Sequence, residues 1–134
     1  DGTMAELNSE EAIEAADTLK PVSHHLRTAL DLLADRESPD YRNSIKESMS
    51  AVESMCKHVT GDEKATLGTA IKNIDLHPSL RVAFSKLYGY TNDADGIRHA
   101  LMEESTLEFE DAKFMLVVCS TFINYLRGKK ARLP

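Results

Sequence analysis

The sequence predicts an all-α protein, a bundle of four to five main helices. Three observations support this prediction. Apolar residues recur at helical spacing in several successive stretches, and helix start and stop signals separate these stretches. No stretch alternates apolar and polar residues as a half-buried strand does. The length of 134 residues suits one domain with one core.

Composition and charge narrow the class of protein. Hydrophobic residues make up 42% and charged residues 28%, with 6 Gly and 4 Pro, which excludes collagen-like, disordered and disulfide-framework chains. No apolar run approaches the roughly 20 residues that span a bilayer, and the N-terminal stretch is acidic and polar, unlike a signal peptide. We therefore expect a cytoplasmic location and no membrane partner. The net charge of −6 argues against broad electrostatic capture of nucleic acid.

Three segments are expected along the chain. Residues 1–21 form a lead-in with a short acidic helix, residues 22–127 form the helical domain, and residues 128–134 form a basic tail. The abrupt start at Asp1 indicates a domain cut from a longer chain, so an N-terminal domain is an expected partner.

The lead-in helix covers residues 10–19 and is stopped by Pro21. The next helix covers residues 22–36, where apolar residues recur at helical spacing. It carries His24 and His25, which point about 100° apart and are treated as surface residues. Its apolar side consists of Val22, Leu26, Ala29, Leu32 and Leu33.

A helix that ends near Thr60 follows a clear start signal. Ser38 is the expected cap and Pro39 the first helical residue, and Gly61 is the expected C-terminal cap. Opposite its apolar side runs a polar stripe of Asn43, Glu47, Ser50 and Ser54. The stripe is a solvent face if pattern alone decides; alternatively Asn43 and Glu47, one turn apart, face a functional loop.

The second half of the chain continues in the same way. A helix is expected over residues 63–74, and His77 is expected to help form the turn before a fourth helix that Pro78 opens and Gly89 ends. A short helical segment covers residues 97–102. Ser105, Thr106, Leu107 and Glu108 match a capping box.

The last helix covers residues 108–127 and is apolar nearly all round. Such a helix is buried on more than one side. It is therefore either the central helix of the bundle or half of a subunit interface.

The stretch from Tyr88 to His99 holds the candidate site. Its two glycines favour sharp turns, and its Asn92, Asp93 and Asp95 favour Asx turns. Arg98 and His99 follow, near the start of a short helix, where a cation and an imidazole suit an anion or a phosphate. The alternative is that this loop only reverses the chain and Arg98 pairs with a nearby acid.

Several kinds of site are absent from the sequence. It has no zinc-type Cys or His spacing, no Walker or dinucleotide loop, and no nucleophile elbow, so we expect neither metal nor cofactor. His99 can exchange a proton near neutral pH, and Arg98 can hold a phosphate in two-point contact. These are the groups that a metal-independent ribonuclease needs, with Asn92, Asp95, Asn43, Glu47 and Tyr90 as supporting residues.

A resemblance to a known family bears on this interpretation. The residues from about His25 to Leu126 resemble the C-terminal half of AbiJ-type abortive-infection proteins. That half is a HEPN-like helical domain. Its matching runs are Asp35-Arg36, residues 39–48, residues 50–53, Leu87-Tyr88-Gly89-Tyr90-Thr91, Asp95-Gly96-Ile97-Arg98-His99, residues 111–117 and Cys119-Ser120.

The resemblance implies a prokaryotic anti-phage protein that forms a homodimer and, as in many HEPN proteins, cleaves RNA without a metal in a dimer cleft. Active members carry an Arg, usually followed by a polar residue, with a His four to six residues after the Arg. No Arg precedes His99 at that spacing. Thr91 stands near the position where the family has its Arg, and Asn92 is the polar residue that follows it. Only Arg98 could substitute, from the adjoining position.

Two main functions are therefore open. In the first, Tyr90 to His99 lie at a dimer cleft that binds RNA or a nucleotide, with His99, Arg98 and Asn92 as catalytic residues. In the second, the domain is a non-catalytic dimerisation, interaction or nucleotide-sensing module, and Arg98 and Glu47 form a structural network.

Overall fold

The computed structural model describes residues 19–92 and 106–131. Five helices make up most of this described part, and it contains no strand, which confirms the predicted all-α bundle. The helices are α2 (Lys20–Ala34), α3 (Tyr41–Thr60), α4 (Leu67–Asn73), α5 (Pro78–Asn92) and α7 (Phe109–Ala131).

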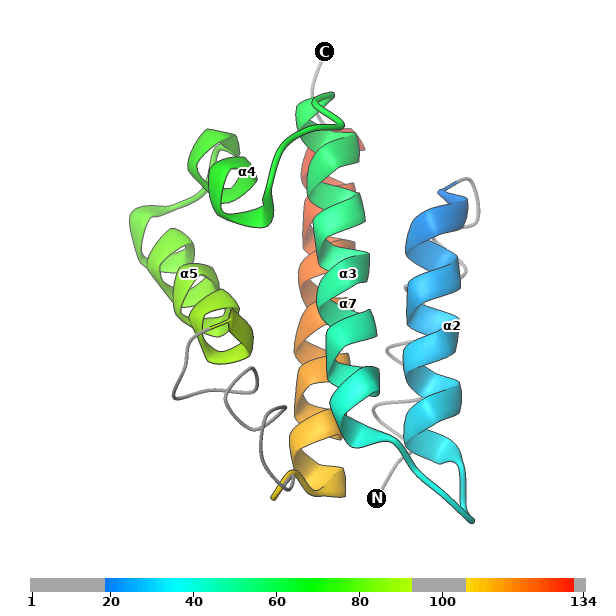
Figure 1. Ribbon diagram of the computed structural model, residues 1–134. Coiled ribbons are helices and arrows are strands. Elements are labelled where there is room, and N and C mark those ends of the chain that lie inside the picture. The colour runs from blue at the N-terminus through cyan, green and yellow to red at the C-terminus, as the bar shows by residue number, and fades with distance from the viewer. Residues whose placement is uncertain (1–18, 93–105, 132–134) are drawn as a thin grey trace.

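The helices α3 and α7 form the centre of the bundle (Figure 1). They lie side by side and run in the same direction, while α2 packs against both from one side and runs in the opposite direction. On the other side, α5 lies at an angle to the central pair, and α4 connects it to the end of α3. The last helix, α7, is therefore a central helix of the bundle, which is one of the two roles predicted for it.

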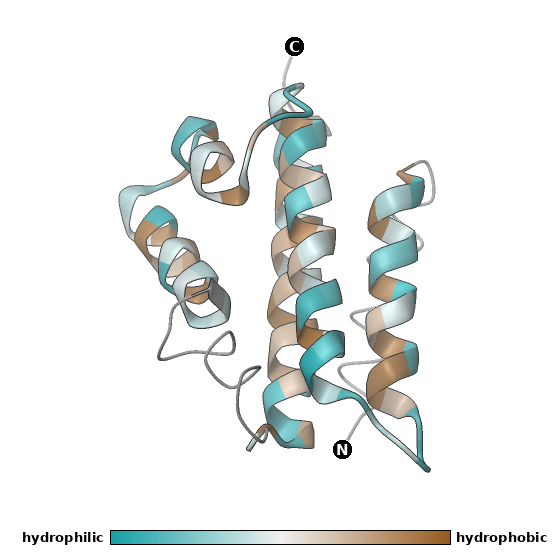
Figure 2. Cartoon of the chain, viewed as in Figure 1, coloured by the Kyte–Doolittle hydropathy of each residue, from teal (hydrophilic) through white to brown (hydrophobic). Residues whose placement is uncertain are grey.

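The core lies where α2, α3 and α7 meet and continues beneath α4 and α5. In Figure 2 the visible central turns of α7 are brown or pale, in keeping with its apolar sequence. Phe84 of α5 stacks on Phe122 of α7, with 3.4 Å between ring centroids. The largest fully buried side chains are Phe122, Leu26, Ile45, Met55, Leu67, Ile71, Met115, Leu116, Ile123, Leu126 and Val22.

Two predicted helix boundaries are confirmed. Gly61 ends α3 in the left-handed conformation (φ 72°), which a glycine adopts without steric cost, and its N–H donates to the Lys57 carbonyl at 2.9 Å. His77 forms the turn before α5, because its Nδ1 accepts the N–H of Ser79 at 3.0 Å.

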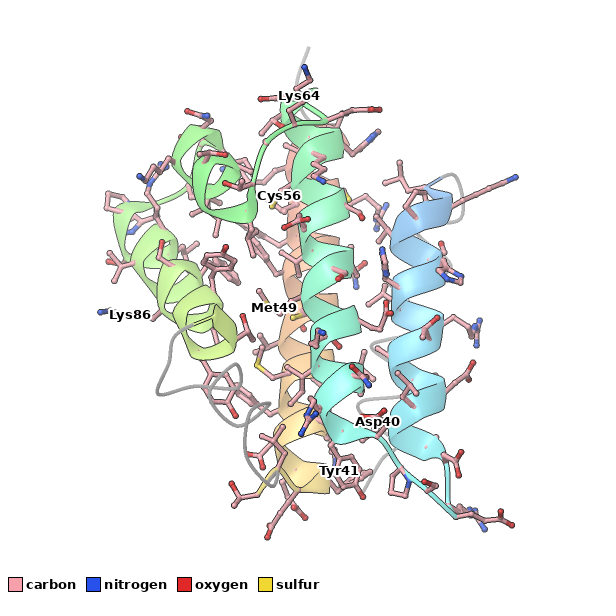
Figure 3. All side chains as sticks on the ribbon, viewed as in Figure 1. Asp40, Tyr41, Met49, Cys56, Lys64 and Lys86 are labelled. Carbon is pink, nitrogen blue, oxygen red and sulfur yellow. The ribbon has the colours of Figure 1, made fainter. Side chains whose placement is uncertain are left out.

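The predicted start of α3 is wrong by two residues. Asp40 is the cap, and its carboxylate accepts the Asn43 N–H at 3.0 Å (Asp40 is labelled in Figure 3). Ser38 instead donates its N–H to the Asp35 carboxylate at 3.0 Å. Asp35 therefore organises the turn, and Pro39 stays outside the helix.

The predicted bounds of α4 and α5 are also corrected. The helix α4 begins only at Leu67, because Thr66 caps it by accepting the Thr69 N–H at 3.2 Å. The helix α5 continues through Gly89 to Asn92. No left-handed glycine interrupts it, since Gly61 is the glycine with positive φ among the described residues.

The starts of α2 and α7 differ from expectation as well. Pro21 lies in the first turn of α2, a position that suits its fixed φ and missing N–H. The helix α7 begins at Phe109, and the Asp111 carboxylate accepts the Glu108 N–H at 2.9 Å, so Asp111 closes the first turn. Ser105 and the expected helical segments before Leu19 and at residues 97–102 lie outside the described residues.

Candidate functional site

The predicted site residues fall into two groups. Asp95, Arg98 and His99 lie outside the described residues, so their convergence with the others stays a prediction. Asn92 is the last residue of α5, and its side chain also lies outside the description. The structure places the remaining three, which are Asn43, Glu47 and Tyr90.

Glu47 forms a close contact between two helices. Its Oε2 lies 2.5 Å from Nδ1 of His25, which joins α3 to α2. The two side chains are 30% and 29% exposed, so water screens this pair only in part. When Glu47 is ionised its carboxylate only accepts hydrogen bonds, so Nδ1 of the imidazole is the donor in this contact. Glu47 therefore has a structural partner on α2.

Asn43 is also engaged locally. Its backbone N–H donates to one carboxylate oxygen of Asp40, and its side-chain Nδ2 donates to the other at 2.8 Å. Both bonds lie within the first turn of α3, where they satisfy a helix-end donor. Asn43 thus helps to hold the capping residue in place.

Tyr90 lies in the last turn of α5, at 38% exposure. Burial, and secondly the carboxylate of Asp111, raise the pKa of the Tyr90 phenol. Asp111 belongs to the first turn of α7, so the carboxylate at the start of α7 acts electrostatically on the last turn of α5. These are the helices that border residues 93–105 in sequence.

His25 is the residue that the sequence analysis missed, because it was assigned to the helix surface together with His24. The sequence did hold a signal for this contact, because His25 stands one residue before Leu26, which belongs to the apolar side of α2. A side chain at that edge of a helix lies beside the neighbouring helix, where an acid such as Glu47 can meet it.

The part of the basic tail that the structure describes, residues 128–131, is helical, and both of its lysines are engaged. Lys129 donates to the Asp75 carbonyl, and Lys130 donates to the His58 carbonyl at 3.0 Å and lies 3.1 Å from Nε2 of His58. Cations that bond carbonyls at helix C-termini are favourable. Burial, and secondly Lys130, lower the pKa of His58.

Two surface hollows lie at this end of the bundle. One, of about 540 Å³, is lined by residues that include Asp75, Lys129 and Lys130. The other, of about 430 Å³, lies between the start of α2 and the end of α3 and is lined by residues that include Lys57 and His58. Neither hollow is lined by Asn43, Glu47 or Tyr90.

The side of α7 that faces away from α3 lacks charges. Between Lys113 and Arg127 every residue is uncharged, and yet Phe114 is 57% and Tyr125 39% exposed. Thr121 is exposed between them, whereas Val118 is half-buried and packs against the core. A helix side that only meets water normally carries charged residues. We call Phe114, Thr121 and Tyr125 the outer face of α7.

The described residues offer no group of three His, Cys, Asp or Glu side chains that could hold a metal ion. In the same part of the chain, no helix combines the length and hydropathy needed to cross a bilayer. The two cysteines are buried free thiols, and burial raises the pKa of both Cys56 and Cys119 to about 12, with Glu53 contributing to the shift of Cys56.

Comparisons with protein-family models, with curated proteins and with solved structures find no match to this chain. A functional proposal therefore depends on the geometry described above and on the resemblance noted in the sequence.

Proposed function

We propose that this chain is a HEPN-like helical domain of a prokaryotic abortive-infection protein and that it acts there by self-association. The outer face of α7 is the observation that carries this proposal. A helix at the centre of the bundle exposes a phenylalanine at 57% and a tyrosine at 39%, and no charged residue stands between Lys113 and Arg127 in its sequence. Such a patch is typical of a surface that another protein covers.

The described members of the predicted catalytic site favour a structural role. Glu47 binds His25 across the α2–α3 contact, and Asn43 binds Asp40 in the first turn of α3. Each of these side chains therefore already has a partner that stabilises the bundle. We also propose a cytoplasmic location, because the two cysteines are buried thiols and not a disulfide.

RNA cleavage at Arg98 and His99 is a second candidate, favoured by the position of Tyr90. The Asp111 carboxylate at the start of α7 helps to raise the pKa of Tyr90 at the end of α5, and these two helices border the Arg98–His99 segment in sequence.

The experiment that separates the two functions is an RNA-cleavage assay. Purified protein is incubated with total RNA and excess chelator, beside the variants His99→Ala and Arg98→Ala. The matched controls are His24→Ala and Arg36→Ala, which remove an exposed imidazole and an exposed guanidinium elsewhere. We expect no chelator-resistant cleavage above a mock purification. Cleavage that His99→Ala and Arg98→Ala abolish, and the controls retain, would establish the ribonuclease instead.

A further inference from the structure

Residues 1–18 lie outside the described residues, and their sequence carries charge of one sign. They hold acidic residues at six positions and no basic residue. The six are Asp1, Glu6, Glu10, Glu11, Glu14 and Asp17. In the helix expected over residues 10–19, Ala12, Ile13 and Ala16 share one side, because they lie within about 100° of one another. The segment is therefore acidic and has a narrow apolar side.

Two stretches of the bundle have the opposite sign. Residues 20–30 of α2 and residues 112–131 of α7 contain no acidic residue. Their basic residues are Lys20, Arg27, Lys113, Arg127, Lys129 and Lys130. The two stretches are neighbours, because α2 packs against α7 and begins at the end of the bundle where α7 ends (Figure 1). This pair of helix stretches therefore complements the charge of residues 1–18.

One edge of α2 is turned away from α3. The opposite edge carries His25, whose imidazole contacts Glu47 of α3. Residues two or five positions from His25 lie about 140–160° from it round the helix. Those positions are occupied by Lys20, Ser23, Arg27 and Leu30. Because Lys20 and Arg27 are exposed and Leu30 is half-buried against the core, this edge presents two cations beside an aliphatic side chain.

One side of α7 borders this edge of α2. Val118 faces α5, because it lines a small apolar cavity together with Phe84. The helices α5 and α2 lie on opposite sides of the central pair (Figure 1). Residues about 100–160° round α7 from Val118 can therefore turn toward α2. Among these are Lys113, Val117, Ser120 and Asn124.

The amide of Asn124 on this side of α7 lacks a hydrogen-bond donor. Its Oδ1 is buried, and within residues 19–92 and 106–131 no donor reaches it. A buried acceptor without a donor costs free energy. A donor from outside the described ranges would remove this cost, and Ser9 and Thr18 of the acidic segment carry hydroxyl groups that can donate.

We infer that residues 1–18 fold back over the neighbouring sides of α2 and α7, antiparallel to α2, with their carboxylates toward Arg27 and Lys113. The segment leads directly into Leu19, the residue that precedes α2, and helical segments joined by a short connection pack antiparallel. Its apolar side, centred on Ile13, then meets Leu30. The outer face of α7 lies on another side of that helix, so this inference does not depend on self-association.

A zero-length carbodiimide crosslinker tests the contact, because it joins a carboxylate to an amine only where the two touch. Equal amounts of unlabelled and isotope-labelled chain are mixed, crosslinked and digested, and mass spectrometry identifies the joined peptides. We expect Lys113 to be joined to acidic residues of the segment at least roughly tenfold more often than Lys46 or Lys86. These control lysines are exposed on α3 and α5, and Lys86 points away from the bundle in Figure 3.

A charge reversal on α2 provides a second measurement. Arg27→Glu places a carboxylate opposite the acidic segment, so it should reduce the Lys113 crosslinks severalfold. The matched control is Arg36→Glu at an exposed site beyond the end of α2, which should leave them unchanged. Circular dichroism checks that both variants stay helical.

The outcomes are distinct. Crosslinks within one chain at Lys113 that Arg27→Glu weakens support the inference. Lys113 crosslinks no more frequent than those of Lys46 and Lys86 overturn it, as do crosslinks that only join labelled to unlabelled chains. Crosslinks that Arg27→Glu leaves unchanged overturn the contact with α2. None of these results involves the outer face of α7, so the inference and the proposed self-association fail separately.

Discussion

The contact between Glu47 and His25 gives a direct test of whether the predicted site residues on α3 are structural. Glu47→Gln keeps the shape of the side chain and removes its charge. The charge-assisted bond that it weakens to a neutral one has a length of 2.5 Å and connects side chains that are 30% and 29% exposed. Removing the charge should therefore lower the free energy of unfolding.

The size of the loss follows from the exposure. Hydrogen bonds to charged groups contribute about 1.5–3 kcal/mol when well shielded. Partial contact with water reduces this toward the lower end, so we expect a loss of about 1–2 kcal/mol. For a chain of this length, that corresponds to a fall in Tm of roughly 4–8 °C.

A double-mutant cycle assigns the effect to the pair. His25→Ala and the double variant complete the cycle, and urea denaturation followed by circular dichroism gives each free energy of unfolding. We expect a coupling energy of about 1 kcal/mol, as is usual for residues in contact. The matched control is Glu53→Gln, since Glu53 lies 3.5 Å from Lys57 in a more exposed pair on the same helix. It should cost less than about 0.5 kcal/mol. Additive effects at Glu47 and His25 would refute the structural role.

Three further predictions follow from the helix ends and the buried thiols. Gly61→Ala should cost about 1 kcal/mol of stability, seen as a lower Tm, because the φ of 72° strains an alanine backbone. No atom lies within 4 Å of the added Cβ, so a clash adds nothing to this cost. An unchanged Tm would exclude a strained cap. Burial and Lys130 lower the pKa of His58 from 6.5, so the unfolded chain binds this proton more tightly. The contribution of neutral His58 to the free energy of unfolding is complete above pH 6.5, and it is lost as the pH falls through the lowered pKa. A plot of Tm against pH should therefore fall less steeply on acidification in His58→Gln, and parallel curves would contradict this. Cys56 and Cys119, with pKa values of about 12, should react with a thiol reagent at pH 8 only after unfolding, whereas rapid labelling of the native protein would show that they are accessible.

The helical class was predictable because it depends on signals within each element. The apolar spacing of α2, α3 and α7 indicates which side is buried, and Gly61 indicates where α3 ends. Each of these signals acts through the residue's own backbone preference or through neighbours one turn away. No contact with a distant part of the chain is needed to interpret them.

The errors arose where two local signals competed. Ser38 and Asp40 can both cap a helix, and Asp40 does so because Asp35 binds the N–H of Ser38. Gly89 can end a helix but can also continue it at a modest cost, and α5 continues past it. Sequence spacing alone does not decide such competitions.

The candidate site was harder to predict because it depends on pairs of residues far apart in the chain. His25 and Glu47 are 22 residues apart and meet only because α2 packs against α3. The pattern favoured a solvent face for the polar stripe of α3, and this is wrong for Glu47, which is half-buried and bonds to His25 of α2. Arg98 and His99 lie outside the described residues, and their roles stay predictions.

The central claim is that the uncharged outer face of α7 is covered by a second copy of the chain. The most direct measurement is the mass in solution by light scattering, for the unaltered chain and for Phe114→Asp, which places a charge at the most exposed aromatic residue of that face. We expect twice the single-chain mass of 14.9 kDa for the unaltered chain at tens of micromolar, and 14.9 kDa for Phe114→Asp. Equal masses for the two proteins, whether single or double, would contradict it.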